Sequence, residues 1–71
     1  MESRYAVIKT KGNDTKVLEL CASKEGAFVA KQKYRETYKG QDVQIDAIHG
    51  EIDHDADGNL IGNKYTLLYQ L

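Results

Sequence analysis

Residues 51–61 have the sequence Glu51-Ile52-Asp53-His54-Asp55-Ala56-Asp57-Gly58-Asn59-Leu60-Ile61. Two interpretations of this stretch, a cation-binding loop between helices and the tip of a β-hairpin, lead to different folds. Aspartate, asparagine and glycine accept the positive φ angles of tight turns, and the flanking residues have the composition of strands. We therefore predict a hairpin tip.

The alternative is a calcium site. The spacing Asp53-x-Asp55-x-Asp57-Gly58-x-Leu60 resembles the first eight positions of the EF-hand loop. The resemblance ends there, because the twelfth position, which supplies a bidentate glutamate in that family, is Lys64, and the flanks are not helical. Weak binding of a divalent ion by the clustered carboxylates stays open.

The rest of the chain predicts a single α+β domain over residues 1–71. Strand patterns at 5–8 and 16–22 flank the turn residues 10–15, a helical pattern follows from the N-cap Ser23 to a terminating Gly40, and strands are expected at 43–52 and 65–71. The predicted order is ββαββ, an antiparallel sheet of about four strands with one helix packed on one face.

Two periodic patterns refine this prediction. Ala27, Ala30, Tyr34 and Tyr38 recur at helical spacing and mark the face of the helix that packs on the sheet. In the strand at 43–52 the apolar residues occupy odd-numbered positions up to residue 47 and even-numbered positions from Ile48 onward. This change of face predicts one long strand bent by a β-bulge, with the bend eased by a glycine at position 50.

A chain of 71 residues buries a small core, and its single cysteine, Cys21, cannot form an internal disulfide. We interpret Cys21 as a buried structural thiol. One helix covers one face of a sheet, yet the predicted strands are apolar on both faces, so we expect a second subunit to cover the other face and the protein to be a homodimer. A shallow, partly hydrated sheet face is the alternative.

The net charge of −1 provides no general attraction to nucleic acid. Nine of the ten Lys and Arg residues precede position 40, whereas six acidic residues and one lysine follow it. The sequence contains no long apolar segment and no amino-terminal apolar region, so we expect a cytoplasmic protein without a membrane association.

The first functional hypothesis is a non-enzymatic binding protein, for example an inhibitor or regulatory subunit, that occupies a surface of a macromolecular partner. The acidic hairpin would present carboxylates to a basic groove as a phosphate backbone does. The candidate partner-binding residues are Glu51, Asp53, Asp55, Asp57 and Phe28. Small size, charge polarisation and the lack of a catalytic motif resemble those of short accessory proteins of phages and mobile elements, a resemblance that assigns no role to any residue.

The second hypothesis is a binding protein for a nucleotide or another anion, with nucleic acid as a related ligand. It uses one side of the predicted helix together with tyrosines, namely Lys24, Lys31, Arg35, Tyr38 and Lys39. A solvated helix face is the plainer interpretation of the same residues.

A metal-dependent hydrolase is the hypothesis that the sequence favours least. His49, Glu51 and Asp53 would share one face of a strand, but a solvated polar face explains them as well. We assign no catalytic residue, no metal site and no cofactor.

Overall fold

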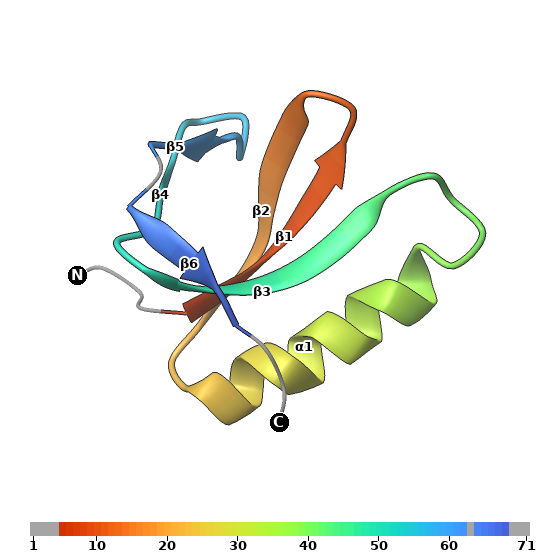
Figure 1. The fold of residues 1–71 in the computed structure, drawn as a ribbon, viewed down its shortest axis with the longest axis horizontal. Coiled ribbons are helices and arrows are strands. Elements are labelled where there is room, and N and C mark those ends of the chain that lie inside the picture. The colour runs from red at the N-terminus through yellow and green to blue at the C-terminus, as the bar shows by residue number, and fades with distance from the viewer. Residues whose placement is uncertain (1–4, 63, 69–71) are drawn as a thin grey trace.

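A computed structural model describes residues 5–62 and 64–68. It has an α+β fold with one helix and a four-stranded antiparallel sheet of order β2-β1-β3-β6 (Figure 1). In chain order the elements are β1 (Tyr5–Lys11), β2 (Asp14–Cys21), α1 (Lys24–Thr37), β3 (Gln44–Gly50), β4 (Asp53–His54), β5 (Leu60–Ile61) and β6 (Tyr65–Leu67). The predicted α+β class, with one helix against an antiparallel sheet, is confirmed.

The predicted order ββαββ is incomplete. Two further strands, β4 and β5, form a separate hairpin between the last two strands of the main sheet. The predicted strand at 65–71 is observed as Tyr65–Leu67, followed by a backbone hydrogen bond of 2.8 Å from the Leu68 amide to the Ala47 carbonyl. The rest of that prediction, residues 69–71, lies outside the described residues.

The helix begins where the sequence predicts. The Ser23 hydroxyl accepts a hydrogen bond of 3.0 Å from the Gly26 amide and so satisfies one of the free amides of the first turn. Ala27 and Ala30 are buried against the sheet, and Tyr34 and Tyr38 pack beside them, which confirms the predicted seam. The helix itself ends at Thr37 with Tyr38 as C-cap, a little before the predicted glycine stop.

The change of parity in β3 has a different cause from the predicted bulge. The pairing of β3 with β1 is regular from Gln44 to His49. Ile45 and Ala47 face the helix, whereas Ile48 faces the opposite side, where it belongs to a second cluster of buried side chains. Both faces of the strand are therefore buried, so a regular strand has apolar side chains at odd-numbered and at even-numbered positions, and no bulge is needed to explain the pattern.

The strand also ends earlier than predicted, at Gly50, and the bend that we expected inside it is a chain turn. Gly50 has φ +141°, and a Cβ built there would lie 2.5 Å from the Lys64 carbonyl oxygen. A side chain at this position would strain the backbone and collide with the chain that leads into β6.

The second face of the sheet is covered by the chain itself. Ala6, Ile8, Ile48 and Ile52 form the buried cluster on this side, and Val17, Leu60 and Tyr65 pack against it. The β4–β5 hairpin lies on this side of the sheet and α1 on the other (Figure 1). The apolar second face, from which we predicted a homodimer, thus receives cover from within the chain; the homodimer remains a prediction.

The β4–β5 hairpin is attached to the edge strand β2. The Val17 amide donates a hydrogen bond of 2.9 Å to the Gly58 carbonyl, and Lys16 forms an isolated bridge with Asn59. Next to this attachment, β2 carries a bulge, because Glu19 is paired with Val7 and Val17 with Ile8, which leaves Leu18 as the extra residue. Within the described ranges, no helix combines the length and apolar content needed to cross a membrane.

Candidate functional site

Residues 51–61 contain the predicted hairpin. In its two strands Asp53 pairs with Ile61 and His54 with Leu60. The tip is closed by a hydrogen bond of 3.1 Å from the Asp55 amide to the Asn59 carbonyl. The flanking elements are strands, so the structure contradicts the helix–loop–helix interpretation.

The Asp55 carboxylate holds this tip together. Its Oδ1 atom accepts hydrogen bonds of 2.9 Å from the amides of Asp57 and Asn59, and its Oδ2 atom accepts one of 3.2 Å from the Asn59 side chain. The bonds from Asn59 are the main reason why the pKa of Asp55 is lowered. Asp55 therefore acts on the shape of the hairpin, and both of its oxygens already have partners.

The other acidic candidates of the hairpin face solvent. Glu51, Asp53 and Asp57 are exposed, and Glu51 lies 3.8 Å from the ammonium group of Lys64. Asp53 accepts a hydrogen bond of 2.8 Å from the amide of the next residue, His54. Asp53 and Asp57 thus present carboxylates on a tip whose backbone is fixed by Asp55.

The two histidines do not join a metal cluster. His49 stacks on Tyr5 with 4.8 Å between the ring centroids, and the Nδ1 atom of His54 lies 3.0 Å from the Asp55 carbonyl. The predicted common face of His49, Glu51 and Asp53 is wrong, because β3 ends before Glu51 and Asp53 belongs to another strand. Among the described residues, no three His, Cys, Asp or Glu side chains are placed to share a metal ion.

Four of the five candidate anion-binding residues come together in one groove. Lys31, Arg35, Tyr38 and Lys39 line an open groove of 430 Å³ between the end of α1 and the start of β3. The strand contributes Gln44, Ile45 and Asp46, and the connecting turn contributes Gly40, Gln41 and Val43.

The charge of this groove is mainly positive. Lys31, Arg35 and Lys39 supply three cations, and Asp46 is the one carboxylate in the lining. No ion pair involves these cations within the portion of the chain that the structure describes. Tyr38 also has a cation of the sheet as a neighbour, since the Lys9 ammonium lies 4.8 Å from the centre of its ring.

Lys24 and Phe28 lie apart from the sites to which we assigned them. Lys24 is absent from the lining of the groove, and its ammonium is 6.0 Å from the centre of the Phe28 ring. Phe28 is half-buried and packs against the core beneath the helix, on the face of the sheet opposite the acidic hairpin. The structure therefore does not bring Phe28 together with the acidic residues.

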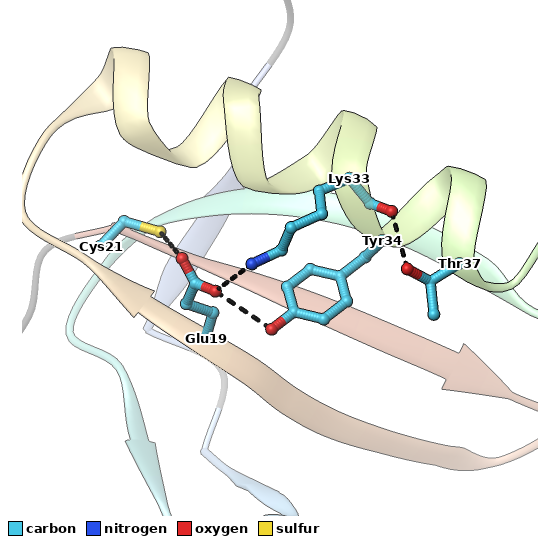
Figure 2. A network of polar contacts seen from close by, with 5 residues as sticks. All are labelled: Glu19, Cys21, Lys33, Tyr34 and Thr37. Atoms are coloured by element: carbon cyan, nitrogen blue, oxygen red, sulfur yellow. Dashed lines mark hydrogen bonds and ion pairs between the residues drawn. The ribbon is translucent and has the colours of Figure 1, made fainter.

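A polar network connects α1 to β2 on the helix-covered face. Figure 2 shows two helix residues directed at the Glu19 carboxylate, which accepts hydrogen bonds of 3.0 Å from the Lys33 ammonium and of 3.0 Å from the Tyr34 hydroxyl. The bond from Lys33, followed by that from Tyr34, lowers the pKa of Glu19, and the same bond to Glu19 raises the pKa of Lys33. Sequence reasoning missed this network because it joins residues from two elements.

Cys21 lies beside this network. Its sulfur is 4.0 Å from a Glu19 oxygen, and burial, with the nearby carboxylate as a second cause, raises the pKa of the thiol. A raised pKa keeps the thiol protonated and weakly nucleophilic. The predicted buried cysteine is confirmed.

The strand side of the groove was also missed by sequence reasoning. Gln44, Ile45 and Asp46 were interpreted only as strand residues. The sequence did contain a signal for this arrangement. The connection from α1 to β3 is short, so the first residues of β3 must lie close to the last turns of the helix.

Comparison of the chain with protein-family models, with curated proteins and with solved structures returned no match.

Proposed function

We propose that the protein is a small non-enzymatic binding protein that occupies a basic surface of a macromolecular partner, as an inhibitor or regulatory subunit does. The observation that carries this proposal is the fixed acidic tip. The Asp55 carboxylate accepts two hydrogen bonds from backbone amides of the tip and a third from the Asn59 side chain, while Asp53 and Asp57 remain exposed. A surface that is ordered before binding loses less conformational entropy when the complex forms.

Charge recognition explains how such a tip selects a partner. Carboxylates on a projecting hairpin complement the potential of a basic groove, accelerate association and disfavour acidic partners. The attachment of Gly58 and Asn59 to β2 places the tip at a defined position on the domain. A groove that binds the phosphates of nucleic acid has the matching charge.

The test is capture of partners from a lysate of cells that express the protein, with wild type and the Asp53→Asn/Asp57→Asn variant compared by mass spectrometry. Asp55 is left unchanged, because its replacement would alter the shape of the tip. Glu36→Gln/Asp42→Asn is the matched control, since it removes two other exposed carboxylates. Partners that are retained by the control and lost by the hairpin variant support the proposal; identical captured sets overturn it.

A second candidate function is the binding of a nucleotide or another small anion. The observation in its favour is the gathering of Lys31, Arg35, Lys39 and Tyr38 around one groove. It predicts that ATP raises the melting temperature of wild type and of Lys24→Gln, a control outside the groove, but not that of Lys31→Gln/Arg35→Gln. The absence of any shift with nucleotides or inorganic phosphate would exclude this function.

A further inference from the structure

The groove beside the cations of α1 also contains part of a sheet edge. β3 pairs with β1 from Gln44 to His49, but β6 pairs only with residues 48–50 of β3. In the described part of the chain, therefore, residues 44–46 have a partner strand on one side only. Such an edge presents backbone amide and carbonyl groups to an incoming chain.

The orientation of these groups follows from the neighbouring hydrogen bonds. The Ala47 carbonyl accepts from Leu68, so the backbone groups of residue 47 point away from β1. Because groups two residues apart in an antiparallel ladder point to the same neighbour, the amide and carbonyl of Ile45 point to this outer edge as well. Ile45 is also part of the groove lining.

The opposite edge of the sheet is protected. β2 carries its bulge at Leu18, and the β4–β5 hairpin bonds to the edge through Gly58 and Asn59. Bulges and covering segments are the usual devices that prevent a strand edge from pairing with another chain. The outer edge at residues 44–46 has neither device in the described residues.

We infer that this edge, together with Lys31, Arg35 and Lys39, is a docking site for an extended acidic peptide segment of a partner, which adds a strand to β3. The peptide backbone would pair with Ile45, and acidic side chains on its helix-facing side would meet the cations. This inference uses the groove and does not depend on the acidic hairpin.

The spacing of the charges agrees with this mode of binding. Lys31 and Arg35 are four residues apart on α1, which corresponds to about 6 Å along the helix axis. Side chains on one face of an extended strand repeat every two residues, or about 6.7 Å. Successive acidic side chains of a peptide whose charges alternate with neutral residues can therefore reach successive cations.

The shape of the groove favours a peptide over a nucleotide. Pockets for small ligands usually enclose most of the ligand surface, whereas this groove is open and polar. A nucleotide would use the cations but would make no use of the outward-facing amide and carbonyl of Ile45. An extended peptide uses both.

The test is titration of the full-length protein with a blocked seven-residue peptide in which glutamate alternates with valine or threonine, followed by amide chemical shifts in NMR spectra. We expect saturable binding that shifts the Ile45 amide and protects it from hydrogen exchange. Arg35→Gln should weaken binding about tenfold, as expected for one charge-assisted contact, and Lys24→Gln should leave it unchanged. Asp53→Asn/Asp57→Asn should also leave it unchanged, which separates this site from the proposed function.

Two modified peptides separate strand addition from charge attraction alone. Replacement of glutamate by glutamine should abolish binding through loss of charge, and N-methylation of the backbone amides should abolish it through loss of pairing. Equal binding of the N-methylated peptide, or displacement of the peptide by ATP without any effect on Ile45, would assign the groove to small anions and overturn the inference.

Two other occupants of the edge also give distinct results. Concentration-dependent self-association that shifts the same amides without peptide would assign the edge to a second copy of the chain. Binding by a chain ending at Leu68, but not by the full chain, would assign the edge to the last three residues. Either result would overturn the inference for the intact protein.

Discussion

Replacing Ile52 by alanine tests whether the chain between β3 and β5 packs on the second face of the sheet. Ile52 is 6% exposed and belongs to the buried cluster with Ile8 and Ile48. The substitution removes three carbons, each contributing about 0.8 kcal/mol on transfer from water. The remaining cavity adds to this loss, so we expect the free energy of unfolding to fall by about 3 kcal/mol.

The hairpin provides a matched control of the same residue type. Ile61 lies in β5 and is 48% exposed, so Ile61→Ala should lower the free energy of unfolding by no more than about 1 kcal/mol. Urea unfolding followed by far-ultraviolet circular dichroism measures both values, with similar m-values expected if the denatured states are alike.

The size of the domain makes this difference easy to detect. Domains have unfolding free energies of about 0.05–0.15 kcal/mol per residue, which gives about 4–11 kcal/mol here. Ile52→Ala should therefore remove a large share of the stability. Equal losses for Ile52→Ala and Ile61→Ala would refute the packing of this segment against the sheet.

Three other predictions concern single sites. Gly50→Ala should lower the free energy of unfolding by at least about 2 kcal/mol, because of its φ of +141° and the close Lys64 carbonyl, whereas Gly12→Ala, with free space around the Cβ position, should cost less in the same urea assay. The pKa values of Glu19 and Asp55 are lowered in the folded protein, so the two ionised carboxylates stabilise the fold at neutral pH, and this stabilisation is lost as the pH falls below about 4. The free energy of unfolding should therefore be lower at pH 3 than at pH 7, and the difference between the two pH values should be smaller for the double variant Glu19→Gln/Asp55→Asn. The Cys21 thiol should react with a maleimide much more slowly in the folded protein than in urea at neutral pH, and equal rates would contradict its burial and raised pKa.

Local patterns in the sequence were sufficient for much of the fold. Ser23 marks the start of the helix because a hydroxyl there satisfies a free amide, and the alanine spacing marks the packed face. The tip at Asp55 was predicted from turn chemistry that acts within a few residues. These features depend on neighbours in the chain, so a single sequence contains them.

Features that depend on distant neighbours were missed. The parity of Ile48 indicated burial on a second face, but a bulge gives the same pattern, and only the fold shows that Leu60 and Tyr65 provide the cover. The cations of the groove were recognised as one side of a helix, whereas their position beside Ile45 depends on how α1 packs against β3. Charge and periodicity therefore predicted that these cations share one side of the helix, whereas the packing of the helix on the sheet determines which strand residues lie beside them.

The most direct test of the proposed binding function is the salt dependence of affinity for a partner captured by the wild-type protein. The proposal predicts that the affinity of the wild-type protein falls steeply as the salt concentration rises. Asp53→Asn/Asp57→Asn should bind more weakly than Glu36→Gln/Asp42→Asn, and its affinity should depend less on salt, because fewer charges meet the basic surface. Affinity and salt dependence that are the same for the two variants would contradict the claim that the acidic tip binds the partner.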